Sequence, residues 1–124
     1  MRYAKVGSVL YILWGLLHIK AAYDEFLLGA SLEPGLVQGK INQGAWDLLV
    51  FALASILIAV FYNWRNSRLG YWLNLVVVSA ADVGFIVFVL IPGDVPFFPG
   101  ILGPLFWVSA AIFSSIGIRS KAVS

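Results

Sequence analysis

Apolar residues fill four long segments of the chain, and polar residues interrupt these segments only singly. The segments run from about residue 4 to 23, 44 to 62, 69 to 91 and 101 to 118. Each is close to the roughly 20 residues that a helix needs to cross about 30 Å of hydrocarbon. Continuous apolar runs favour helices, whereas the strands of a barrel would alternate. The pattern therefore predicts an all-α integral membrane protein, a four-helix bundle formed as a single domain.

The composition agrees with a membrane protein and excludes several kinds of site. Of the 124 residues, 61% are hydrophobic and only 11% are charged, whereas roughly a quarter are charged in a soluble domain. The absence of cysteine excludes disulfides, iron–sulfur clusters and thiol catalysis, and a single histidine excludes a site built from several imidazoles of one chain. We therefore expect no metal site. A net charge of +2 without a basic stripe gives no reason to expect a nucleic-acid partner.

Lysine and arginine lie mainly on one side of the expected spans. They precede the first span, occupy the short second connection and follow the fourth span, as Arg2, Lys5, Arg65, Arg68, Arg119 and Lys121. The opposite side carries Glu33 and Asp94, with Lys40 as its loop cation. Because basic residues are enriched in cytoplasmic loops, both termini are predicted to be cytoplasmic.

Several ionisable residues fall inside or at the ends of the expected spans. They are His18, Lys20, Asp24, Glu25, Asp47 and Asp82. A charge at the centre of a span costs roughly 2.5–3.5 kcal/mol on insertion scales, so each needs a partner or a purpose. A rise of roughly 1.5 Å per helical residue places His18, Asp47 and Asp82 together in the outer half of the membrane.

Helical spacing groups these polar residues with aromatic ones, because residues three or four apart share a face. The expected stripes are Tyr11, Trp14, His18, Ala22 and Glu25 on the first helix, Gln43, Trp46, Asp47, Val50 and Ala54 on the second, and Tyr71, Leu75, Val78 and Asp82, with Asn74 beside them, on the third. We expect the three stripes to turn inward, toward a shared cavity that opens outward.

Such a cavity has the residues for acid–base chemistry and for ligand binding. His18, Asp47 and Asp82 could divide into an acid and a base and so isomerise or cyclise a lipophilic substrate. Carboxylates beside tryptophan rings also suit an organic cation. The residues expected to contact this small lipophilic or cationic ligand are Trp14, Glu25, Gln43, Trp46 and Asn74.

Three other interpretations stay open at this point. The chain could be a proton-coupled small-molecule transporter that works as a homodimer, because four spans are too few to enclose a transport path. It could be an accessory subunit of a larger membrane complex, because small residues make the fourth helix suited to close packing. Alternatively, the polar groups only hold the helices in register: His18 would bond Asp47 or Asp82, and Lys20 would pair with Asp24. Membrane lipid is a partner in every case.

Two families resemble the chain. In size, number of spans and cytoplasmic termini it is similar to the small multidrug resistance transporters, which work as dimers around membrane-embedded acids. That family relies on an acidic residue in its first helix, where this chain has His18, so its mechanism is not carried over. The segments Trp14-Gly15-Leu16-Leu17-His18 and Gly39-Lys40-Ile41-Asn42-Gln43-Gly44-Ala45-Trp46-Asp47 resemble the small bacterial four-helix membrane proteins grouped as DoxX-like. This resemblance implies a bacterial or archaeal cytoplasmic membrane.

Overall fold

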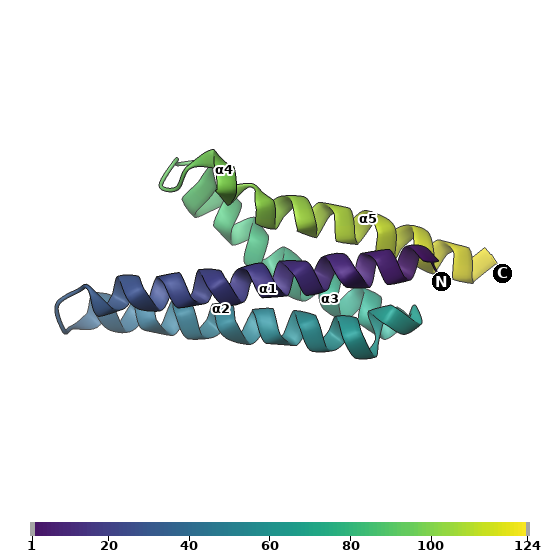
Figure 1. The fold of residues 1–124 in the computed structure, drawn as a ribbon, viewed down its shortest axis with the longest axis horizontal. Coiled ribbons are helices and arrows are strands. Elements are labelled where there is room, and N and C mark those ends of the chain that lie inside the picture. Colours follow the sequence, from purple (N-terminus) through teal and green to yellow (C-terminus); the bar gives the residue numbers. More distant parts are fainter. Residues whose placement is uncertain (1, 124) are drawn as a thin grey trace.

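The computed structural model describes residues 2–123 of the chain, and within this range it is helical without strands (Figure 1). In chain order the elements are α1 (Arg2–Ala30), α2 (Leu36–Phe61), the 3₁₀ turn η1 (Asn63–Arg65), α3 (Arg68–Phe85), the π-helical segment η2 (Ile86–Leu90), α4 (Phe97–Gly100) and α5 (Leu102–Val123). Four stretches are long and apolar enough to cross a membrane: Arg2–Ala30, Leu36–Arg65, Arg68–Leu90 and Leu102–Lys121. The prediction of four helices that are long and apolar enough to span a membrane is confirmed.

The first two helices are longer than the apolar pattern indicates. The expected spans of residues 4 to 23 and 44 to 62 correspond to the helices Arg2–Ala30 and Leu36–Phe61. Only residues 31–35 separate these two helices in the chain. Gly39 does not interrupt α2, because its N–H donates to the carbonyl of Gly35, 3.0 Å away, in the first helical turn. Gly35 has a φ of 154°, which an L side chain rarely adopts, so the chain reverses there.

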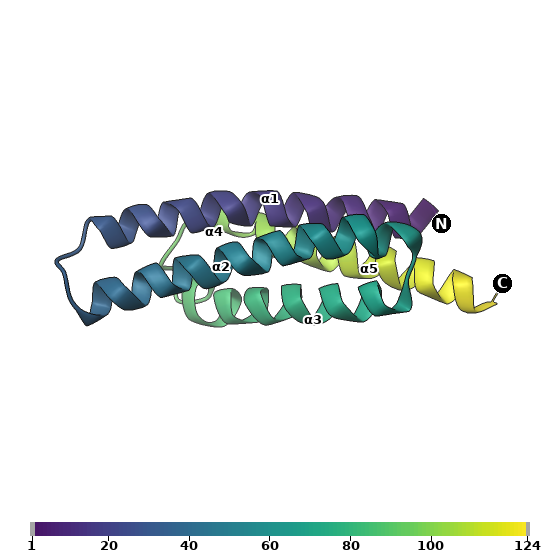
Figure 2. The same ribbon diagram turned by 90° about the horizontal axis from the view of Figure 1, so that it is seen from below.

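All the long helices run antiparallel to the neighbour that follows them in the chain, and both termini lie at one end of the molecule (Figures 1 and 2). This end is called the terminus end below, and the opposite end the loop end. Helix α1 packs along both α2 and α5, whereas α3 packs against α5 and against α2. At the loop end the connection between α1 and α2 projects beyond α4 (Figures 1 and 2).

Small residues allow α1 to approach its two neighbours closely. A Cβ atom at Gly117 of α5 would lie only 2.9 Å from the backbone nitrogen of Ala4, and one at Gly15 of α1 would lie 2.8 Å from the carbonyl oxygen of Ala52 in α2. Lipid tails are as apolar as leucine, so helices in a bilayer gain from close van der Waals packing more than from hiding apolar surface. The positions of glycine and alanine therefore set which helix faces meet.

The tight connection between α2 and α3 fixes the terminus end of α5. Asn66 adopts a left-handed conformation with a φ of 56°, and its side-chain Nδ2 donates to the carbonyl of Gly117, 2.9 Å away. The Lys121 ammonium donates to the Asn66 carbonyl at 3.0 Å. Ser67 caps α3 by accepting from the Gly70 N–H at 3.4 Å. The two bonds that involve Asn66 join the connection to α5, across 51 and 55 residues of sequence.

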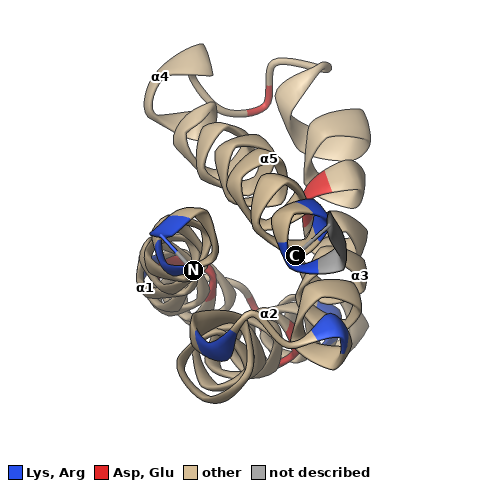
Figure 3. Ribbon diagram, turned by 90° about the vertical axis from the view of Figure 1, so that its right-hand side faces the viewer, with Lys and Arg blue, Asp and Glu red and all other residues tan. Residues whose placement is uncertain are grey.

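Most of the basic residues gather at the terminus end, with Lys20 and Lys40 as the exceptions. Figure 3 views the molecule from this side and shows blue segments on α1, α3 and α5. Two short pairs stabilise individual charges: the Lys5 ammonium lies 5.0 Å from the ring centre of Trp64, and Lys20 pairs with Asp24 at 2.6 Å one turn further along α1. The Lys20–Asp24 pair confirms one sequence expectation. Both of its side chains are exposed, and exposed pairs of this kind stabilise by less than roughly 1 kcal/mol.

Candidate functional site

One predicted polar pair lies in contact between α1 and α3. Asp82 of α3 has no exposed surface, and its Oδ2 accepts a hydrogen bond from the indole Nε1–H of Trp14, 3.0 Å away in α1. The other carboxylate oxygen, Oδ1, lies 3.6 Å from Nε2 of His18. Trp14 and His18 stack on each other with ring centres 4.0 Å apart. The three side chains form a compact cluster, called the His–Asp–Trp site below.

The orientation of the His18 ring determines which of its nitrogens carries a proton. Nδ1 lies 2.8 Å from the carbonyl oxygen of Trp14, one turn earlier in the same helix. A carbonyl can only accept, so Nδ1 carries a hydrogen and donates it. In the neutral imidazole the other nitrogen, Nε2, then has a bare lone pair. That lone pair faces Asp82.

Two acceptors facing each other require a proton between them. Within the described part of the chain, Oδ1 of Asp82 is buried and has no hydrogen-bond donor, and Nε2 of His18 lies 3.6 Å from it. An ionised Asp82 beside a neutral His18 would leave two lone pairs in opposition and a buried charge without a full set of donors. A single added proton, on Nε2 or on Oδ1, turns this opposition into an attraction. The His–Asp–Trp site therefore has an arrangement of acceptors that one shared proton would stabilise.

The start of α5 closes the site. A Cβ atom at Gly103 would lie 2.9 Å from Cε1 of His18, 3.2 Å from its Nε2 and 3.8 Å from Oδ1 of Asp82. Only glycine leaves room for the backbone of α5 at this point. The cluster is thus covered by α5, and His18 keeps only a narrow exposed edge, with 11% of its side chain accessible.

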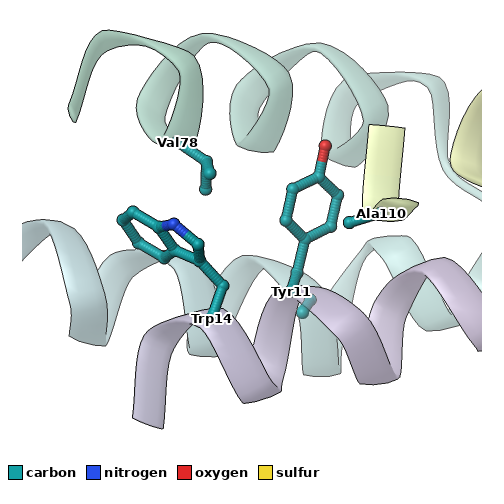
Figure 4. Close-up of a cluster of buried hydrophobic side chains, with 5 residues drawn as sticks. Tyr11, Trp14, Val78 and Ala110 are labelled. Carbon is teal, nitrogen blue, oxygen red and sulfur yellow. The ribbon is translucent and has the colours of Figure 1, made fainter. Parts of the chain in front are cut away.

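Below the site, toward the terminus end, lies the apolar core of the bundle. Tyr11, Trp14, Val78 and Ala110 pack together there from α1, α3 and α5, and Figure 4 shows Val78 close to both rings. Tyr11 and Trp14 are the largest fully buried side chains in the described residues. This core holds α1 and α3 at the distance that brings His18 to Asp82.

The expected convergence of three ionisable residues is wrong, because Asp47 lies elsewhere. Asp47 is exposed on the face of α2 that points away from α1, together with Gln43, Trp46 and Val50. The buried face of α2 is instead made of Ala45, Ala52, Ser55 and Ala59. Trp46 is 59% exposed, so it forms no wall of a shared cavity within one chain. Small residues, rather than large or charged ones, are turned inward on this helix.

Two further residues expected to bind a ligand also lie apart from the His–Asp–Trp site. Asn74 is buried toward the terminus end, where its Nδ2 donates to the Ser55 carbonyl at 3.1 Å and to Oδ1 of Asn63 at 2.8 Å. Asn74 thus joins α3 to α2 and to the turn η1 that follows α2. Glu25 is half-buried on α1, and a Cβ atom at Gly44 of α2 would lie 3.5 Å from its carboxylate. The structure thus brings together only Trp14, His18 and Asp82 of the predicted set.

Gly103 is the site residue that the sequence interpretation missed. The Gly-Ile-Leu-Gly-Pro segment, residues 100–104, indicates a turn before the fourth span, and a glycine in a turn carries no sign of a contact with another helix. The available signal is the spacing of small residues along α5: Gly103, Ala110, Ser114 and Gly117 are all buried. In a membrane helix this spacing marks the face that meets a neighbour.

Two surface grooves lie away from the site. One groove of about 400 Å³ runs between α3 and α5, and another of about 270 Å³ lies beside Lys5 and Trp64. Neither is lined by His18 or Asp82. Among the described residues no group of three or more His, Cys, Asp or Glu side chains could hold a metal ion.

Comparison with known proteins found no matching family, no similar curated protein and no similar solved structure.

Proposed function

We propose that this chain is a proton-coupled membrane protein that exchanges a proton for a small lipophilic or cationic molecule and works as a homodimer. The observation that carries the proposal is the opposition of His18 Nε2 and Asp82 Oδ1, 3.6 Å apart, with no other donor on that oxygen in the described residues. Intramembrane Asp–His pairs are the groups from which proton relays in pumps and transporters are built.

A proton bound at this site would control how firmly α1 is held to α3. With the proton, His18 and Asp82 attract each other and add to the hydrogen bond that Trp14 donates. Without it, two lone pairs oppose each other in a region of low dielectric constant, where electrostatic effects are large. Proton release therefore favours separation of the two helices. Because α5 begins at Gly103, against the same two side chains, its position would respond as well.

The distribution of charge gives the direction of coupling. The basic residues of the terminus end favour that end as the cytoplasmic one. The His–Asp–Trp site then lies in the outer half of the bilayer, about 14 residues or roughly 21 Å along α3 from Arg68. The proposed proton is accordingly taken up from the outer side.

Uptake into proteoliposomes tests this function, with tetraethylammonium as the probe because it is a cation without an ionisable proton. We expect a pH gradient to drive uptake by the wild-type chain, and the variants Asp82→Asn and His18→Gln to reduce gradient-driven uptake at least about tenfold. The matched control is Lys20→Gln, which removes an exposed charge from the same helix as His18 and should leave uptake unchanged. Uptake that is insensitive to the gradient would contradict the proposal.

A spectroscopic readout separates loss of the proton site from damage to the fold. The chain has a single histidine, so ¹⁵N-histidine labelling reports on His18 alone. In a pH titration, the Nε2 resonance of His18 and the carboxyl ¹³C resonance of Asp82 should change in the same steps, because coupled groups titrate as a pair. Nδ1 should stay protonated throughout. Independent titration of the two groups would show that they share no proton.

The exposed face of α2 favours the dimeric form. Asp47 lies at about the same depth as His18 and Asp82, yet it faces outward beside Gln43 and Trp46. A carboxylate facing lipid at this depth is costly, and a second copy of α2 would cover it and supply Gln43 as a hydrogen-bond donor. Trp46 and Asp47 would then line the path of a cation, through cation–π and charge attraction.

Cross-linking tests this interface directly, because the natural chain has no cysteine. The variant Val50→Cys places one thiol on the proposed α2 interface, one turn from Asp47. We expect oxidation in liposomes to convert most of this variant into disulfide-linked dimers. Val76→Cys is the control: Val76 is 64% exposed on α3, and its thiol should give monomers. Equal cross-linking of the two variants would argue for random collision instead of a defined dimer.

A further inference from the structure

A groove on the membrane-facing surface runs between α3 and α5. Its volume is about 400 Å³, within the roughly 300–1,000 Å³ range of small-molecule sites. It is lined by Leu75 of α3 and by Trp107, Val108, Ala111, Ile112, Ser115, Ile116 and Arg119 of α5. The walls are almost entirely apolar, and the only charged residue among them is Arg119.

The length of the groove matches one leaflet of a bilayer. Its lining on α5 extends over the 13 residues from Trp107 to Arg119, whose 12 helical steps span roughly 18 Å. Half of a hydrocarbon core is roughly 15 Å. The groove therefore reaches from near the middle of the membrane to the surface at the terminus end, as an extended acyl chain does.

Two hydrogen bonds fix the antiparallel register of α3 against α5. The hydroxyls of Tyr71 and Ser115 lie 2.9 Å apart, and the indole of Trp107 donates to the Ser79 hydroxyl at 2.9 Å. Because these bonds use the polar atoms of Trp107 and Ser115, the remaining surface of the groove is apolar. The same register places residue 68 opposite residues 118 and 119.

The register places Arg68 of α3 at the same level as Arg119 of α5, at the terminus end of the groove. Arg68 continues the face of α3 that carries Tyr71 and Leu75, since these residues are spaced three and four apart. Both arginines are exposed. In the described part of the chain the ion pairs are His18–Asp82 and Lys20–Asp24, so neither guanidinium has a carboxylate partner.

We propose that this groove binds one anionic phospholipid, with an acyl chain along α5 and the phosphate between Arg119 and Arg68. A guanidinium donates two parallel hydrogen bonds to a phosphate, and it does so at the interface without leaving water. Two arginines without counter-charges favour a headgroup of net negative charge over a zwitterionic one, whose cationic group they would repel. The site lies at the opposite end of α3 from Asp82 and is independent of the proton coupling proposed above.

Native mass spectrometry of the full chain in detergent tests the proposal, with phosphatidylglycerol as the probe and phosphatidylcholine as its zwitterionic comparison. We expect the wild-type chain to retain phosphatidylglycerol about five- to tenfold more strongly. The variant Arg119→Gln changes an exposed residue and should reduce this preference to near one. Ala111→Phe, which fills the apolar part of the groove, should weaken binding of both lipids. Arg65→Gln, a basic residue of the same end that does not line the groove, is the matched control and should bind like the wild type.

Three results would overturn the proposal. Equal retention of the two lipids by the wild-type chain would show that the groove holds only the surrounding bilayer. Equal effects of Arg119→Gln and Arg65→Gln would show that the preference comes from the general charge of this end. A dimer that Ala111→Phe abolishes and phosphatidylglycerol fails to displace would show that a second copy of the chain occupies the groove.

Discussion

Replacing Asp82 by alanine is expected to lower the free energy of unfolding by roughly 3 kcal/mol, the size seen when one partner of a buried polar pair is removed. Trp14 has no exposed surface, and its indole N–H has Asp82 as its acceptor. In the variant this donor would remain buried without a partner. His18 would lose its interaction with α3 at the same time. Reversible unfolding in mixed micelles with increasing denaturing detergent measures the change.

Two matched variants identify the cause of this loss. Asp82→Asn keeps a carbonyl oxygen that accepts from Trp14, so it should be destabilised less, by roughly half as much. Asp47→Ala makes the same substitution at about the same depth, but on an exposed face. It should change the free energy of unfolding of the monomer by less than about 0.5 kcal/mol, because an exposed Asp47 faces the detergent micelle in both the folded and the unfolded monomer. If Asp47→Ala and Asp82→Ala lower the free energy of unfolding by the same amount, the burial of Asp82 and its hydrogen bond from Trp14 are not the cause of the loss.

The second large effect is expected for Gly117→Ala, which should destabilise the fold by about 2–3 kcal/mol. The added Cβ would meet the Ala4 nitrogen at 2.9 Å and its Cα and Cβ at 3.1 Å. Backbone atoms of a rigid helix cannot rotate away as a side chain does, so α1 and α5 must move apart. That movement would also disturb the bond from Asn66 to the Gly117 carbonyl.

Gly84→Ala provides the control, because it makes the same substitution at a helical position with nothing within 4 Å of the new methyl group. Alanine forms helix more readily than glycine by roughly 0.8–1.0 kcal/mol in an unconstrained helix, so this variant should be unchanged or slightly more stable. Detergent unfolding of both variants gives the comparison. A similar loss for Gly84→Ala would mean that close helix contact is not what Gly117 provides.

The number of helices long and apolar enough to cross a membrane, and the position of their apolar segments, could be predicted from the sequence. Crossing hydrocarbon requires about 20 apolar residues whatever the tertiary structure, so the pattern alone is sufficient. The ends were harder to place: α1 and α2 continue well beyond the apolar core, to Ala30 and from Leu36. Polar residues near the membrane surface do not end a helix. Here the turn that contains Pro34 and Gly35 separates the two helices instead.

The inward face of α1 was also predictable. Tyr11, Trp14, His18 and Ala22 share one stripe of the sequence and are buried in the structure. The same polar criterion failed for α2, where the outward face carries Gln43 and Asp47 and the inward face carries alanine and serine. In water, the pattern of polar and apolar residues identifies the inward face of a helix, because the apolar residues are the ones that become buried. In a bilayer both surroundings are apolar, and side-chain size determines which faces approach.

The sequence by itself determined an all-helical chain with four apolar spans, and it placed His18, Asp47 and Asp82 at one depth, because depth follows from counting residues along a helix. Only the tertiary structure decided which of them meet. Rotation of each helix about its axis depends on close contacts such as those of Gly15 with Ala52 and Gly117 with Ala4. These contacts turn His18 toward Asp82 and Asp47 away, because a helix in lipid is oriented by the neighbour it can approach most closely.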